Sequence, residues 1–315
     1  MKLKSVLKLI GVLGASVGSL AAINKGIFAL AKKNNPEIEY GEYYEWKYGQ
    51  VHYKKIGCGK PILLLHSLTI GGSHCEFTKN IEELSKKYTV YALDLPGFGY
   101  SDKPKITYTA FTYASFINDF ITEIIGEPSM VVASNGSGMF ATIAAKLFSQ
   151  NVTHLTLISP NGISDEMAKN SDFYRRTILE LPLYGTTIYN YHSSKRIIKQ
   201  FLLSDGFYAP EKVDKTAIDT FYYPAHGTST NVRYAYASFA TKYMNMDIKG
   251  YFENLHIPIC IIWGEEHTTN PIENMDILKE LQPTSEFYIF EETKMFPHYE
   301  NAEEFNSLIM GKMQD

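Results

Sequence analysis

Cysteine is scarce in this sequence, and the common metal-binding and phosphate-binding motifs are missing. The three cysteines, Cys58, Cys75 and Cys260, are odd in number and widely spaced, which fits neither a zinc-ligand pattern nor a disulfide framework. No Gly-x-x-x-x-Gly-Lys run occurs, so the chain lacks the loop that cradles nucleotide phosphates. We therefore predict no metal site and no cofactor.

Acidic residues are absent from the first 34 positions, although the chain as a whole is acidic. Residues 1–34 hold six lysines, so the formal net charge of −4 leaves −10 on the remaining residues. A body of that charge repels a nucleic-acid backbone. The charge distribution therefore predicts no nucleic-acid partner.

A long uncharged stretch follows the basic start. Residues 9–23 carry no charge, but this stretch is shorter than the roughly 20 apolar residues that a membrane-spanning helix needs. Three interpretations stay open: an uncleaved membrane anchor, a secretory signal cleaved near Ser19–Ala21, and a helix packed on the folded body. We favour the anchor, which predicts a membrane-associated protein. The cleaved signal predicts a secreted protein, and the packed helix predicts a cytoplasmic one.

Apolar runs alternate with helical patterns along most of the chain. Runs such as Pro61–His66 suit strands buried on both faces, and their alternation with helices predicts a mostly parallel, doubly wound α/β sheet. Residues 163–250 break this rhythm, because they have the pattern of short helices and hold ten of the 23 tyrosines. We predict an N-terminal segment over residues 1–34, a core over 35–162 and 251–315, and a helical cap over 163–250.

One strand–turn–helix sequence has the setting of a nucleophile elbow. The run of β-branched residues ending at Ser134 meets a corner of small residues, and an Ala-rich helical pattern follows. Such an elbow ordinarily reads Gly-x-Ser-x-Gly, with the serine exposed above a parallel sheet. The five places here read Ala-Ser-Asn-Gly-Ser over residues 133–137. The nucleophile's place is therefore taken by the amide of Asn135.

Four further segments extend this pattern into a family resemblance. Over roughly residues 40–313 the chain resembles the α/β-hydrolase superfamily, with similar motifs in the family's order at Pro61–Ser67, Asp94–Pro104, Ile257–His267 and Phe296–Phe305. The resemblance implies the α/β-hydrolase fold, with a helical cap inserted after the sixth strand. It also implies a site at the carboxyl ends of the parallel strands.

The family's catalytic triad does not carry over residue by residue. Alignment without gaps places the nucleophile on Asn135, the acid on His267 and the histidine on Met295. An amide cannot attack a carbonyl carbon, and a thioether cannot move a proton. The resemblance therefore implies a hydrolase fold without the usual acyl-transfer triad, and whether the protein is an enzyme stays open.

Other polar residues supply alternatives to the missing triad. Ser137 could be a displaced nucleophile, with His267 or His298 as its base. The oxyanion hole depends on backbone N–H groups, which the resemblance assigns to Leu68 and Gly136.

Two more side chains complete the predicted site. The motif Pro61–Ser67 resembles the family's oxyanion segment, and its Ser67 is a candidate for the pocket. His226, in the cap, is another candidate. The leading hypothesis is a catalytically degenerate member that binds a small apolar or amphipathic ligand. The alternatives are an esterase-like serine hydrolase acting on an ester-like substrate, and a membrane-tethered structural or interaction protein.

Overall fold

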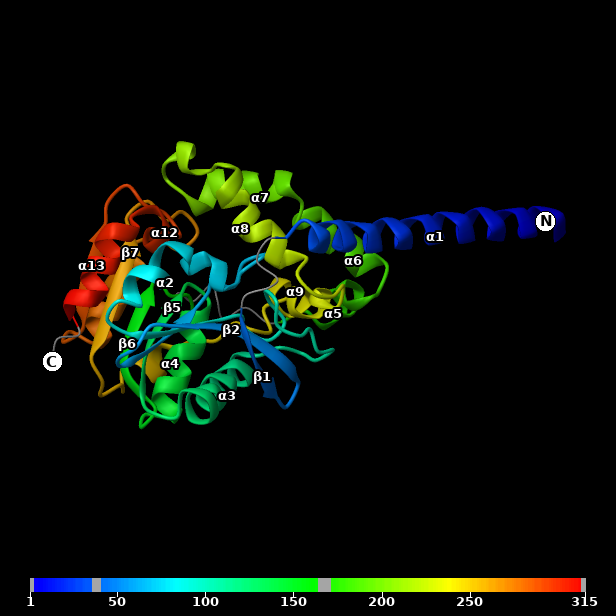
Figure 1. Cartoon of the computed structure of the whole chain (residues 1–315). Helices are drawn as coiled ribbons and strands as arrows, with labels where there is room; N and C mark the ends of the chain where they lie inside the picture. Colours follow the sequence, from blue (N-terminus) through cyan, green and yellow to red (C-terminus); the bar gives the residue numbers. More distant parts are fainter. Residues whose placement is uncertain (1–2, 36–40, 164–170, 313–315) are drawn as a thin grey trace.

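The computed structural model describes residues 3–35, 41–163 and 171–312, and the side chains of residues 17–35, 41–163 and 171–311. Parts of the predicted segments reach residues 1–2, 36–40, 164–170 and 313–315, which lie outside this range. The described chain folds around one eight-stranded sheet, which helices cover on both faces (Figure 1).

The sheet has the order β1-β2-β4-β3-β5-β6-β7-β8. The β1–β2 and β2–β4 pairs are antiparallel, and every later pair is parallel. The carboxyl ends of the strands from β3 to β8 consequently meet at one edge. The strands are β1 (Glu42–Trp46), β2 (Gly49–Ile56), β3 (Pro61–Leu65), β4 (Thr89–Leu93), β5 (Ser129–Ser134), β6 (Val152–Ile158), β7 (Ile259–Gly264) and β8 (Glu286–Phe290).

Strand β3 shows why its sequence is apolar without interruption. Leu63 and Leu65 point into one core cluster, and Ile62 and Leu64 point into another on the opposite face. The first core lies under α3 (Ala110–Phe120), its π-helical extension η2 (Ile121–Ile125), α4 (Ser137–Leu147), α10 (Lys249–Phe252) and α11 (Asn274–Leu281). The second lies under η1 (His74–Phe77), α2 (Thr78–Leu84) and α13 (Ala302–Lys312), and the short helix α12 (Pro297–Glu300) precedes α13.

A mostly helical cap is inserted between β6 and β7, as the sequence predicted. Its α-helices are α5 (Phe173–Glu180), α6 (Tyr184–His192), α7 (Lys195–Phe201), α8 (Lys215–Ala225) and α9 (Val232–Ala240), with short turns η4 (Leu202–Gly206) and η5 (Pro210–Lys212). Asp172 and Asp214 begin α5 and α8 by accepting backbone N–H groups of the first turn. The helices lie together beside the sheet domain (Figure 1).

Helix α1 (Leu3–Lys33) joins the cap by its carboxyl-terminal part. Asn24 is buried, donates to Thr187 Oγ1 at 3.0 Å and accepts from Asn190 Nδ2 at 2.9 Å. Phe28 is also buried, with its ring 5.0 Å from that of His226. This part of the predicted N-terminal segment is therefore packed into the folded body.

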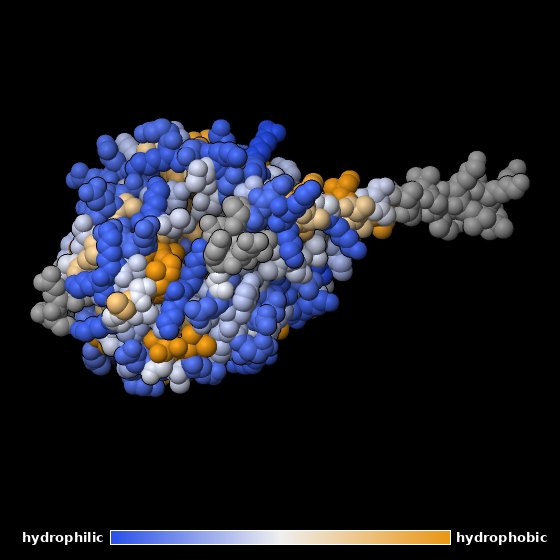
Figure 2. Space-filling model, in the orientation of Figure 1, coloured by the Kyte–Doolittle hydropathy of each residue, from blue (hydrophilic) through white to orange (hydrophobic). Residues whose placement is uncertain are grey.

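The other end of α1 extends away from the body (Figure 1). Val17, Ile23 and Leu30 are exposed apolar side chains of this helix. Hydrophobic residues are visible on the surface where the helix leaves the body (Figure 2). Within the part of the chain that is described, no helix has the length and apolar character needed to cross a membrane.

The turn after β4 is held by a buried carboxylate. Asp94 lies 3.0 Å from His52 Nδ1 and 2.9 Å from His74 Nδ1, and it accepts the Tyr100 N–H at 2.8 Å. Burial alone would raise the pKa of Asp94, but the two histidines outweigh it and hold that pKa well below its usual value. A side chain at Gly99, where φ is +50°, would collide with the Asp94 carboxyl group.

Candidate functional site

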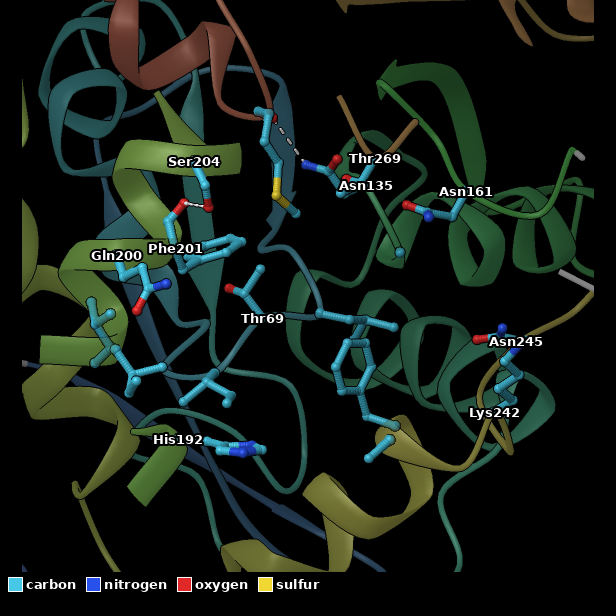
Figure 3. A pocket seen from close by; sticks show the side chains of 18 of the residues that line it. Thr69, Asn135, Asn161, His192, Gln200, Phe201, Ser204, Lys242, Asn245 and Thr269 are labelled. Atoms are coloured by element: carbon cyan, nitrogen blue, oxygen red, sulfur yellow. Dashed lines mark hydrogen bonds between the residues drawn. The ribbon is translucent and has the colours of Figure 1, made fainter. Parts of the chain in front are cut away.

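Asn135 stands in the sharp turn between β5 and α4. Its φ is +49°, a left-handed conformation that costs most side chains energy and that asparagine tolerates better than most. Its Nδ2 donates to the Met295 carbonyl at 3.1 Å and to Ser134 Oγ at 3.0 Å, which fixes the orientation of the amide (Figure 3). Two of the three residues at the family's triad positions are therefore in direct contact.

Ser137 lies below this turn, in the first turn of α4. Its side chain is fully buried, and its Oγ is within hydrogen-bond reach of the Ser134 carbonyl at 2.9 Å and the Leu65 carbonyl at 3.1 Å. These acceptors tie the end of β5, the end of β3 and the start of α4 together. Among the described residues this hydroxyl has no imidazole partner, and it does not line the cavity described below.

Leu68 and Gly136 are neighbours at the floor of the site. A Cβ built on Gly136 would approach the Leu68 side chain to 2.7 Å, so a larger residue at position 136 would displace that side chain. Within the described chain, neither backbone N–H donates to a carbonyl or a side chain. The pair therefore offers two unengaged backbone N–H groups, the kind of donor that an oxyanion hole uses.

His66 supports the oxyanion segment from beneath. Its Nε2 accepts the Leu95 N–H at 3.0 Å, so its Nδ1 carries the proton and donates to the Ser67 carbonyl at 2.8 Å. Burial lowers the pKa of His66, which suits the neutral form that these two hydrogen bonds require.

Ser67 and His298 meet through a third buried group that the sequence analysis missed. Glu76 Oε2 accepts from Ser67 Oγ at 2.6 Å and from the Ser67 N–H at 3.0 Å, and Glu76 Oε1 lies 3.2 Å from His298 Nε2. Burial raises the pKa of Glu76, but the neighbouring His298 and the hydrogen bond from Ser67 outweigh this effect and hold the pKa below its usual value. This network lies behind the oxyanion segment, and none of its three members lines the cavity.

His267 follows β7 and is almost completely buried. Its Nε2 lies 3.3 Å from Thr269 Oγ1, and burial lowers its pKa to about 4, against a smaller opposing effect of Asp205. The ring is therefore neutral near pH 7. Neither Asn135 nor Ser137 is among its hydrogen-bond partners.

A cavity of about 850 Å³ opens above the elbow, between the core and the cap (Figure 3). Asn135, Gly136, Leu68 and Met295 form its floor, and most of the remaining wall is apolar. Helix α7 supplies Ile197, Ile198 and Phe201 from the cap, and the opposite wall includes Asn161, Lys242 and Asn245.

His226, which the sequence analysis proposed for the pocket, is not among the residues that line this cavity. Its Nδ1 donates to the Tyr222 carbonyl at 2.9 Å and its Nε2 accepts from Ser193 Oγ at 3.1 Å, deep in the cap beside Phe28. The sequence could not show this, because the packing of α1 against the cap brings together residues almost 200 positions apart. Conversely, Lys242 and Asn161 lie in irregular segments without a motif, and the sequence analysis missed them both.

The sheet order, the elbow and the inserted cap together define an α/β-hydrolase fold. The chain belongs to that family, since a family model described as alpha/beta hydrolase fold matches residues 60–302. An uncharacterized protein of Mycobacterium tuberculosis is 25% identical over 267 residues, which cover 82% of this chain and 76% of that protein.

A named hydrolase is equally similar. The 2-hydroxy-6-oxo-6-(2'-aminophenyl)hexa-2,4-dienoic acid hydrolase of Metapseudomonas resinovorans is 25% identical over 273 residues, 81% of this chain and 84% of that enzyme. Among solved structures, a membrane phospholipase A superposes with a TM-score of 0.69 at 19% identity, covering 100% of both chains. At that identity the superposition shows the shared fold alone.

Proposed function

We propose that this protein binds a small apolar or amphipathic molecule in the elbow cavity and does not hydrolyse it. The observation that carries the proposal is Asn135 in the strained turn, bonded to the backbone of Met295. The cavity above it is large enough for a small-molecule ligand and mostly apolar. The free N–H groups of Leu68 and Gly136 would hold a carbonyl or carboxylate oxygen of the ligand without turnover.

Loss of the nucleophile and the base together accounts for the absence of hydrolysis. Removing either group from a serine-protease triad costs on the order of 10⁶ in kcat. Asn135 offers no nucleophilic atom, and Met295 offers no proton acceptor of useful strength. His267 is sealed by burial, so it is poorly placed to replace either one.

Hydrolysis through Ser137 is the alternative function. It is favoured by the retained pair of N–H groups and by the hydrolase names among the relatives. The two carbonyls around the Ser137 hydroxyl oppose it, because they place the oxygen against the sheet rather than the cavity.

We also propose that residues 1–34 hold the protein at a membrane. Residues 9–23 are uncharged and have lysines on both sides, an arrangement that suits insertion among lipids with anionic head groups. The docked part of α1 would then fix the cap, and with it the cavity, at a set distance from the lipid surface.

The binding proposal is tested with the full chain and two probes, the uncharged dye Nile red and the ester 4-nitrophenyl decanoate. We expect saturable Nile red fluorescence, displacement of the dye by the ester, and release of 4-nitrophenol no faster than in buffer. Ala240→Trp, which fills the cavity, should abolish binding, and the exposed Leu147→Trp should not. Ester turnover that disappears in Ser137→Ala would overturn the proposal, as would a failure to bind either probe.

A further inference from the structure

Asn161, Lys242 and Asn245 form a polar wall on one side of the cavity (Figure 3). The other side is mixed: α7 supplies Ile198, Gln200 and Phe201 to the lining, and Ser204 follows the helix. Asn161 follows β6, whereas Lys242 and Asn245 follow α9, so two separate segments build the polar wall. A uniformly apolar ligand would leave the Lys242 ammonium group beside it without a hydrogen-bond partner, which costs binding energy.

Lys242 gives the polar wall a positive charge. No aspartate or glutamate lines the cavity within the described chain, and Lys242 is the one lysine or arginine that does. Its ammonium group takes part in no ion pair or hydrogen bond among the described residues, although its side chain is half-buried. The other basic side chain, His192, stays neutral at pH 7, because burial and the nearby Arg175 lower its pKa.

The backbone at Lys242 is one that lysine does not favour. Its φ is +65°, and the Tyr243 N–H closes the end of α9 on the Ser238 carbonyl at 2.9 Å. Helix ends of this kind usually carry glycine at the left-handed position, because a Cβ makes that conformation less stable. A lysine in this position, beside a cavity that no acidic residue of the described chain lines, indicates a charge kept for something other than stability.

We propose that the ligand is an anionic amphiphile, whose carboxylate or phosphate head lies at Lys242 and whose single apolar chain lies along α7. This inference rests on the proposed binding function and names the class of molecule bound. Asn161 supplies an amide beside the ammonium group, and Ile198 and Phe201 cover the chain. The negative head pairs with the half-buried charge, and a neutral or cationic head leaves it uncompensated.

Displacement of Nile red by four ten-carbon probes tests the proposal: decanoate, decyl phosphate, decanol and decyltrimethylammonium. We expect at least one anionic probe to bind about tenfold more tightly than decanol, and the cationic probe to bind most weakly. Whichever of decanoate and decyl phosphate binds more tightly shows whether the site prefers a carboxylate or a phosphate head. Lys242→Met should reduce the preference to within about twofold, whereas Lys199→Met, on the exposed outer side of α7, should preserve it.

Lys242→Gly separates recognition from folding. Glycine fits the left-handed position, so this variant should melt at the same temperature as the wild type or higher, and yet lose the preference for anions. Decanol binding as tightly as the anions, or an unchanged preference in both Lys242 variants, would overturn the head-group inference and leave the binding function intact. Failure of all four probes to displace the dye would overturn both.

Discussion

At the residue scale, the site is defined by what each side chain already contacts. Asn135 is engaged by Met295, and the Ser137 hydroxyl is engaged by two carbonyls. The sequence indicated a tight turn at Asn135, because small residues between a strand and a helix leave little choice of turn, and the structure has a tight turn there. The sequence could not decide whether the Ser137 hydroxyl faces the cavity or the sheet, because a shift of two residues in the position of the elbow would exchange these two orientations.

Ser137→Ala should lower the free energy of unfolding by about 1–2 kcal/mol, since a buried hydroxyl hydrogen bond is lost. Nile red binding should be unchanged. Urea unfolding measures the first effect, and the exposed Ser204→Ala serves as a control with a change below about 0.5 kcal/mol. Loss of ligand binding or of ester turnover at unchanged stability would instead assign Ser137 a chemical role.

His267 makes stability depend on acid pH. Its native pKa is about 4, below the ordinary 6.5, so the unfolded chain binds a proton that the native state does not. Stability is therefore complete above pH 6.5 and is lost as the pH falls toward 4, by on the order of 3 kcal/mol. His267→Gln should remove this part of the loss. Urea unfolding of the wild type and of His267→Gln at pH 7 and pH 4.5 measures the effect. An equal loss of unfolding free energy in both proteins would contradict this role of His267.

At the scale of elements, the fold could be predicted further than the cap. Strands such as β3 are buried on both faces, so their uninterrupted apolar sequence is enough to predict them. The motif at Asp94–Pro104 likewise predicted the turn after β4. The docking of α1 was left open, because it depends on contacts such as Asn24 with Asn190 that no local pattern contains. Lys242 could not be predicted for the same reason, since its proposed role in binding an anionic head group depends on the α7 residues that line the same cavity.

Asn24→Ala should destabilise the cap by about 1–3 kcal/mol, because Thr187 and Asn190 lose buried partners. The effect is expected as a lower melting temperature and as faster hydrogen exchange in α6. Ile23→Ala, one position away and 58% exposed, provides the matched control. Identical melting and exchange in the two variants would show that α1 contributes nothing to the cap.

At the scale of the whole molecule, α1 begins with lysines and an uncharged stretch over residues 9–23, and its other end packs against the cap beside the cavity. The full chain should therefore sediment with vesicles that contain anionic lipid. Leu13→Asp with Val17→Asp charges the uncharged stretch without altering Asn24 or Phe28 and should abolish sedimentation. Phe111→Asp, exposed on α3, should sediment like the wild type. Equal sedimentation of all three proteins would rule out the proposed tether.

The central claim is that this α/β-hydrolase fold binds without covalent chemistry, and covalent labelling tests it most directly. The full chain is exposed to a fluorophosphonate probe, and the adduct is sought by intact mass and peptide mapping. The Asn135→Ser, Met295→His double variant, which returns a nucleophile and a base to the elbow, shows whether the probe reaches the site. We predict no adduct on the wild-type protein. An adduct on Ser137 that disappears in Ser137→Ala would contradict the account.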